Sequence, residues 1–238
     1  MVDVVKIDPV GGQALIEGVM MRSARRTAMS CRKQDGSIVT RIVNKQPLNK
    51  SLPWSLPIVR GAVTMVEMLM LGYDALSWSA NQQLEEEEQM SSRDVVLTLC
   101  VALVATIGVF VVIPYFLTFL FTKNQGFIFT IIDGLIRIVL FLAYLIIIGR
   151  MAEVRTLYEY HGAEHKAVHC HEAGKKLTPK NVLTFPKEHP RCGTSFLLIT
   201  LVVAIITFSL VSTSSTLLNI LSRVVLLPVI AGISFEIL

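Results

Sequence analysis

The feature that most constrains the fold is a run of 27 residues, 95–121, that contains no charged side chain. Coiled as a helix, this run extends about 40 Å, which exceeds the roughly 30 Å hydrocarbon core of a bilayer. Pro114 lies inside it and predicts a kink, because proline lacks the N–H that an α-helix uses. The whole chain is 53% hydrophobic, and its apolar residues come in long runs rather than in amphipathic stripes. We therefore expect an integral membrane protein.

Three further apolar stretches follow this run along the chain. Residues 127–149 contain Asp133 and Arg137, whose four-residue spacing allows the two charges to pair on one helix face. Residues 195–211 and 217–238 are separated by a short polar patch, and the second of them is interrupted by an arginine and a proline. The sequence thus predicts a mainly α-helical membrane protein with about four transmembrane helices in two hairpins.

The basic residues predict how these hairpins are oriented. Residues 1–60 hold ten lysines and arginines and residues 150–194 hold eight, whereas the short links inside the hairpins hold few. Because cytoplasmic loops carry the excess of positive charge, both polar segments are expected in the cytoplasm. The first residues also lack the apolar core of a cleavable secretory signal. The prediction is a multi-pass protein of the inner (plasma) membrane with a cytoplasmic N-terminus and the lipid bilayer as its first partner.

These features divide the chain into five expected parts. They are a β-rich cytoplasmic cap (1–57), an interfacial helix with an acidic linker (58–94), a first transmembrane hairpin (95–149), a cytoplasmic histidine-rich metal loop (150–194) and a second hairpin (195–238). The helix of the second part carries three charged residues, which favour the membrane interface over a full crossing. The last hairpin has no polar tail, so the native chain is expected to continue beyond it.

Two patterns in the cap predict its strands. Asp35-Gly36 favours a tight turn, and it separates residues 27–33 from residues 38–43, so these segments predict a β-hairpin. Before them, residues 11–22 read GGQALIEGVMMR, with two glycines ahead of an alternating run. The glycines mark either a turn entering a strand or a backbone that must approach another group closely.

The histidines indicate where chemistry can occur. All five lie between His161 and His189, and residues 161–165 match the His-x-x-Glu-His pattern of inverted zinc hydrolases. On a helix, His161 and His165 lie on one face about 6 Å apart along the axis, so both imidazoles can bind one ion. Glu164 can then act as the general base toward a metal-bound water. We expect Zn²⁺, with another divalent transition metal as the alternative.

Two imidazoles do not hold a metal alone, so a further ligand must come from elsewhere. The segment His-Pro-Arg-Cys-Gly-Thr, residues 189–194, offers His189 as the first choice and Cys192 as the second. Its proline and glycine favour the rigid, sharply turned backbone on which a ligand loop is built.

Three nearby residues are less suited to this ion. Glu172 is eleven residues beyond His161, about 16 Å along an intact helix, and can ligate only if the helix ends first. A glycine at position 174 favours an end just after it. His169 and His171 are expected to be bystanders that bond lipid headgroups or neighbouring loops.

Three motifs together resemble one family. GGQALIEGVMMRS, YHGAEHKAVHCHEAG and HPRCGTSF are similar to segments of the YqhQ-like bacterial membrane proteins, the domain of unknown function 1385, described as predicted metal-dependent enzymes. The resemblance implies that Gln13, Glu17 and Arg22 of the first motif pack against the metal loop and contact a substrate headgroup. Arg191 belongs with them as an anion binder, since a guanidinium holds a carboxylate or phosphate with two hydrogen bonds; a salt bridge to a loop glutamate is equally expected.

The leading prediction is a zinc-dependent hydrolase whose site lies at the cytoplasmic face and acts on a lipid-like or membrane-delivered substrate. The alternative is a non-catalytic scaffold or regulator whose structural ion organises a surface for a protein partner. A closed four-ligand shell would favour the scaffold and an open position would favour the enzyme. A di-iron membrane oxygenase needs more histidines than the five present. Nucleic-acid binding is not expected, because membrane orientation explains the net charge of +4.

Overall fold

The computed structural model describes six ranges of the chain: residues 10–24, 26–44, 54–84, 92–124, 126–211 and 216–238. The acidic linker predicted around residues 85–88 lies outside them. The chain divides into two compact units, which are described separately. The sheet unit comprises residues 1–50, 66–89 and 149–192, and the helical unit comprises residues 51–65, 90–148 and 193–238.

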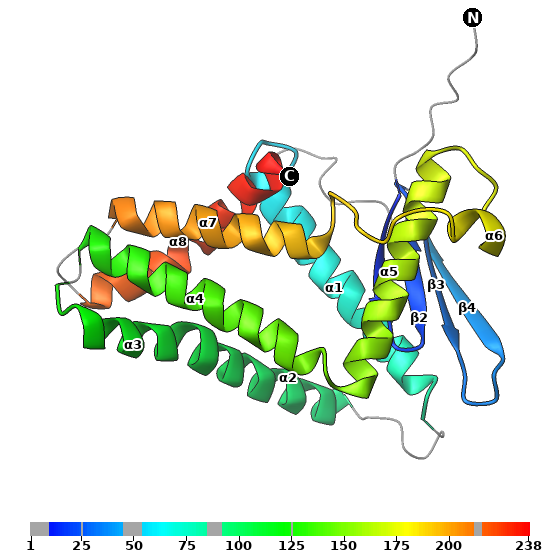
Figure 1. Cartoon of the computed structure of the whole chain (residues 1–238), viewed down its shortest axis with the longest axis horizontal. Helices are drawn as coiled ribbons and strands as arrows, with labels where there is room; N and C mark the ends of the chain where they lie inside the picture. Colours follow the sequence, from blue (N-terminus) through cyan, green and yellow to red (C-terminus); the bar gives the residue numbers. More distant parts are fainter. Residues whose placement is uncertain (1–9, 25, 45–53, 85–91, 125, 212–215) are drawn as a thin grey trace, which may run out of the picture. The chain divides into compact units, whose positions relative to one another are not determined.

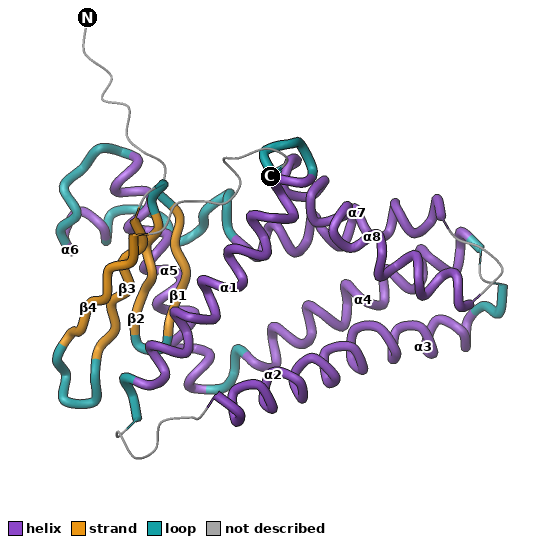
Figure 2. Tube along the Cα trace, turned by 180° about the vertical axis from the view of Figure 1, so that it is seen from behind, coloured by secondary structure: helices purple, strands orange, loops and turns teal. Residues whose placement is uncertain are grey.

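A four-stranded antiparallel sheet forms the centre of the sheet unit, with its strands in sequence order (Figure 2). The strands are β1 (Gly11–Leu15), β2 (Gly18–Arg22), β3 (Arg26–Arg32) and β4 (Ile38–Asn44). The hairpin predicted around Asp35-Gly36 is confirmed as β3–β4, in which Thr27 is opposite Val43. Gly36 has a φ of 82°, and the Asp35 carboxylate accepts the Ser37 N–H at 2.8 Å, so both residues favour the turn.

Helices pack against both faces of this sheet, because successive side chains of a strand point to opposite sides. One face carries Leu15, Met20 and Met29, which form a buried core with Ala75 of α1 (Val59–Asn81). The other face is covered by α5 (Ala152–Glu172), which packs on β1 and β2. Figure 1 shows α5 in front of the strands, and in Figure 2, seen from behind, α1 passes in front of them.

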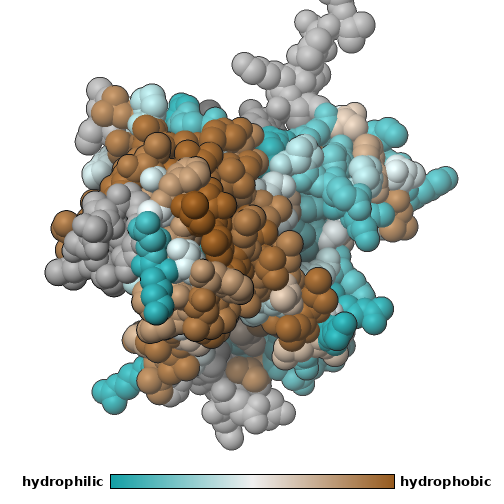
Figure 3. Space-filling view, turned by 60° about the vertical axis from the view of Figure 1, so that its left-hand side comes forward, coloured by the Kyte–Doolittle hydropathy of each residue, from teal (hydrophilic) through white to brown (hydrophobic). Residues whose placement is uncertain are grey.

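The helical unit contains the long apolar helices. They are α2 (Ser92–Ile107), the π-helical turn η3 (Gly108–Val112), α3 (Ile113–Phe121), α4 (Phe127–Ile148), α7 (Gly193–Val211) and α8 (Thr216–Ile237). By length and composition, three described segments can cross a membrane: Val96–Phe121, Phe127–Ile148 and Gly193–Val211. The fourth predicted stretch forms α8. Large apolar side chains stay exposed on this unit, Leu120 and Leu210 by 80% and 82%, and Figure 3 shows such side chains gathered over one face.

Near Pro114, where the sequence predicts a kink, the structure has the π-helical turn η3. The turn ends at Val112, directly before α3, whose second residue is Pro114. A proline ring clashes with the carbonyl one turn earlier, and a wider turn relieves that clash without ending the helix. The run 95–121 therefore continues as one helical segment through the proline.

Two glycines allow the first turns of α1 to approach α8 closely within the helical unit. A Cβ atom at Gly61 would lie 2.8 Å from the Cβ of Phe235 and 3.0 Å from the Cα of Gly232. Arg60 adds an ion pair, with its Nε donating to Glu236 at 2.7 Å. The approach thus depends on the absence of a side chain at Gly61.

We predict opposite effects for two glycine-to-alanine changes in this unit. Gly108→Ala has open space around its new methyl group and gains helix propensity, so it should keep or raise the melting temperature. Gly61→Ala places its methyl against backbone and should destabilise the unit by about 1–3 kcal/mol. Thermal unfolding of both variants in the same detergent compares their melting temperatures. Equal shifts would contradict the close approach.

Candidate metal centre

Helix α5 carries the paired histidines. It follows an extended Met151, has Glu153 in its first turn, where a negative charge favours the helix dipole, and ends at Glu172. Gly174 has a φ of 66°, a left-handed conformation that ends helices, so the predicted end just after Glu172 is confirmed. Within the helix, the rings of His161 and His165 lie 4.3 Å apart between centroids.

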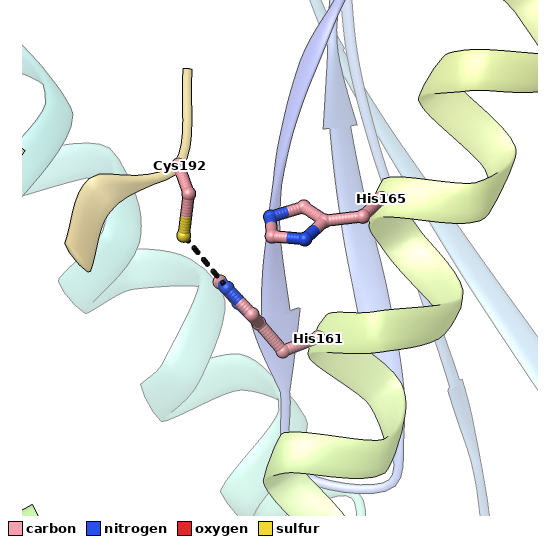
Figure 4. A group of neighbouring side chains, drawn as sticks. All are labelled: His161, His165 and Cys192. Carbon is pink, nitrogen blue, oxygen red and sulfur yellow. Dashed lines mark hydrogen bonds between the residues drawn. The ribbon is translucent and has the colours of Figure 1, made fainter. Parts of the chain in front are cut away.

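Cys192 joins these two histidines. Its Sγ lies 3.1 Å from Nε2 of His161, and the ligand atoms of His161, His165 and Cys192 lie within 4.8 Å of one another (Figure 4). A tetrahedral zinc ion, with bonds of about 2.0–2.3 Å, holds its ligand atoms roughly 3.4–3.7 Å apart. Small side-chain movements therefore suffice to bring these three atoms to bonding distance of one ion.

A backbone contact sets the proton position on His165. Its Nδ1 lies 2.6 Å from the carbonyl oxygen of Lys187, and a carbonyl can only accept, so Nδ1 carries the proton. The lone pair then lies on Nε2. Metal-binding histidines usually donate their other N–H to a carbonyl or carboxylate in this way, which fixes the ring.

His189, the first choice from the sequence, lies in a neighbouring group. Its Nδ1 accepts the backbone N–H of Arg191 at 3.2 Å, and its Nε2 lies 3.5 Å from the Glu172 carboxylate. Both ring nitrogens are thus already in contact with a partner. The ring remains 5.7 Å from that of His165 between centroids, so His189 borders the first group without joining it.

The neighbouring group contains His169, Glu172 and His189, whose ligand atoms also lie within 4.8 Å of one another. His169 donates from Nε2 to the carbonyl of Glu188 at 2.9 Å. Arg191 forms a salt bridge with Glu172, the arrangement expected as the alternative to anion binding. These contacts hold residues 188–191 against the last turns of α5, and the group is a second candidate for an ion. The sequence placed His169 among the bystanders that bond neighbouring loops, and its bond to Glu188 is of that kind, although its ring also lies in this group.

Glu164 is buried beside the paired histidines. It is 4% exposed, its Oε2 lies 3.6 Å from Nε2 of His165, and burial raises the pKa of its carboxyl above the ordinary value. Gly12 of β1 packs directly against it, since a Cβ atom there would lie 2.6 Å from Cγ and 2.8 Å from Cδ of Glu164. Of the two interpretations of the glycine pair, close backbone approach therefore applies to Gly12.

The donor set suits a soft or borderline divalent ion. Two imidazoles and a thiol are ligands that zinc binds, whereas magnesium and calcium prefer oxygen. Burial lowers the pKa of His161 first, and the neighbouring His165 adds to the effect, so the imidazole stays neutral and available as a ligand.

The predicted substrate-binding residues of the first motif lie at different places. Gln13 and Arg22 face α1: the Gln13 amide packs against Gly72, and Arg22 pairs with the buried Glu67 at 3.5 Å. Glu17, in the turn between β1 and β2, accepts the hydroxyl proton of Tyr160 at 3.1 Å. Among the side-chain hydrogen bonds of the described residues, that of Glu17 joins this motif to α5. Strand alternation explains the separation, since Gly12 and Gln13 point to opposite faces.

Comparisons with known proteins agree with the family indicated by the three motifs. The family model described as "Protein of unknown function (DUF1385)" matches residues 56–238. The "Uncharacterized protein YqhQ" of Bacillus subtilis (strain 168) is 32% identical over 254 residues, covering 98% of this chain and 79% of the relative. No solved structure matches.

Adjacent glycines provide a matched test of the contact with Glu164. Gly11→Ala meets open space and should change stability by less than about 0.5 kcal/mol. Gly12→Ala should destabilise the protein by about 1–3 kcal/mol, because its methyl overlaps the Glu164 side chain. Adding Glu164→Ala should reduce the loss of stability that Gly12→Ala causes. A double-mutant cycle of melting curves measures this reduction. Additive effects would exclude the contact.

Proposed function

We propose that this chain, which belongs to the DUF1385 family of proteins of unknown function, is an integral membrane hydrolase with a zinc site formed by His161, His165 and Cys192. The observation that carries the proposal is the convergence of these three ligand atoms beside a buried carboxylate. Three protein ligands leave one position of a tetrahedral ion for water, as in catalytic zinc sites.

The chain's own residues have separate tasks in this proposal. A zinc ion bound here would lower the pKa of a bound water to about 7 and polarise a substrate carbonyl or phosphoryl oxygen. Glu164 would accept a proton at its carboxylate and return it to the leaving group, and burial, which raises the pKa of this carboxyl, makes the carboxylate a stronger base. The Lys187 carbonyl orients His165, and Gly12 leaves the space in which Glu164 lies.

The apolar helices support a membrane location for this enzyme. Three described helices are long and apolar enough to cross a bilayer, and they expose large aliphatic side chains that water solvates poorly. The basic residues of segments 1–60 and 150–194 favour a cytoplasmic site in the inner membrane. We therefore propose a lipid-like or membrane-delivered substrate.

A scaffold with a structural ion is the second candidate. It is favoured by the contacts of Lys187, Glu188 and Arg191 with α5, because an ion beside them would further tie this segment to the helix. In that case, Glu164 would serve packing rather than proton transfer.

Glu164→Gln separates the two candidates. The enzyme should retain its metal, because the three ligands are unchanged, and lose at least about 100-fold in hydrolysis, because an amide cannot accept the proton. Mass spectrometry measures the metal content. Turnover of a panel of ester and phosphoester amphiphiles in nanodiscs measures the hydrolysis. Metal loss in this variant would instead make Glu164 a ligand, and unchanged turnover would remove its catalytic role.

The ligand assignment predicts a pattern of metal content. His161→Ala and Cys192→Ala should each bind less than about a tenth of the wild-type zinc, because two ligands hold the ion poorly. His189→Ala should retain most of it, since His189 lies in the neighbouring group. His171→Ala serves as a control that also removes a histidine from the end of α5. Equal zinc in all four variants would contradict the site, and loss in His189→Ala would show that His189 holds zinc, in the first group or in the neighbouring one.

A further inference from the structure

Three charged side chains meet among the apolar helices of the helical unit. The guanidinium of Arg137 donates from Nε and Nη2 to the two carboxylate oxygens of Asp133 at 3.0 and 3.2 Å, which confirms the predicted pair on α4. Arg223 of α8 approaches the same carboxylate, with its Nη1 3.4 Å from Oδ2. We call Asp133, Arg137 and Arg223 the charged triad.

The triad lies in apolar surroundings. The side chains of Asp133, Arg137 and Arg223 are 4%, 17% and 19% exposed, and the Arg223 guanidinium lies 5.5 Å from the ring centre of Phe208 on α7. Arg137 is ten residues from the start of α4, so it lies about 15 Å along a helix of roughly 33 Å. Arg137 is thus far from both ends of α4.

The charges of the triad do not balance. Two guanidiniums face one carboxylate, which leaves one positive charge, and within the described residues both arginines form ion pairs with Asp133 alone. Arg137 already neutralises Asp133 with a two-point contact, so the pair does not require Arg223. An uncompensated charge in apolar surroundings is costly, and such residues usually mark a binding site or a pathway.

We propose that the charged triad binds an oxyanion, a carboxylate or phosphate group, between Arg137 and Arg223. A guanidinium has five N–H donors in a planar fork that matches these anions, and the contacts with Asp133 engage only part of each fork. Asp133 positions Arg137 and reduces the local charge to a single positive unit, so the site favours a monoanion. This site is independent of the metal centre, which lies in the other unit.

Two sources can supply such an anion: the head of a membrane amphiphile or free inorganic phosphate. Purified full-length protein in a neutral detergent is equilibrated with radiolabelled oleate in one arm and radiolabelled phosphate in the other. We expect saturable binding of about one molecule per chain in one of the arms. Arg223→Gln should weaken it at least tenfold, whereas Arg155→Gln, the same charge change at an exposed position, should leave it unchanged.

Asp133→Asn gives an effect of opposite sign. Removing the competing carboxylate should strengthen anion binding about tenfold. If the triad served only to hold the fold, both Arg223→Gln and Asp133→Asn should weaken anion binding. If Arg223→Gln is not monodisperse, Arg137→Gln, which retains Arg223, replaces it. Binding of neither probe, or binding that is insensitive to both Arg223→Gln and Asp133→Asn, overturns the proposal.

Discussion

The candidate metal centre depends on how residues 187–192 are held against α5. A helix presents ligands along one line, so two histidines of α5 alone cannot surround an ion, and a group from another segment must complete the set. Here the carbonyls of Lys187 and Glu188 accept from His165 and His169, and Arg191 pairs with Glu172. These contacts are made at successive turns of the helix. They hold the segment in the position from which Cys192 reaches His161.

The sheet contributes to the same site through a missing side chain. Gly12 lets β1 approach α5 so closely that Glu164 is buried against its backbone, and this burial raises the pKa of the carboxyl. Glu17 strengthens the attachment by bonding Tyr160, even though its φ of 53° is unfavourable for a residue with a side chain. The first motif therefore holds α5 through Gly12 and Glu17, while its Gln13 and Arg22 contact α1.

The features that the sequence predicted correctly are local in the chain. The turn at Asp35-Gly36, the helix end before Gly174 and the pairing of Asp133 with Arg137 each depend on residues at most four positions apart. The approach of Gly12 to Glu164 joins residues 152 positions apart, and no periodicity signals it. The sequence therefore left the glycine pair with two interpretations, and the packing of β1 on α5 selects between them.

The choice between His189 and Cys192 as the further ligand also depends on contacts that the sequence does not signal, here individual hydrogen bonds. Residue types alone ranked His189 first, because imidazole is a common zinc ligand. The backbone N–H of Arg191 occupies its Nδ1, and the Glu172 carboxylate, itself held by Arg191, lies beside its Nε2. Arg191 thus directs both a histidine and a glutamate away from the first group. In the proposed enzyme, the first group then supplies three ligands, the number that leaves a position for water in a catalytic zinc site.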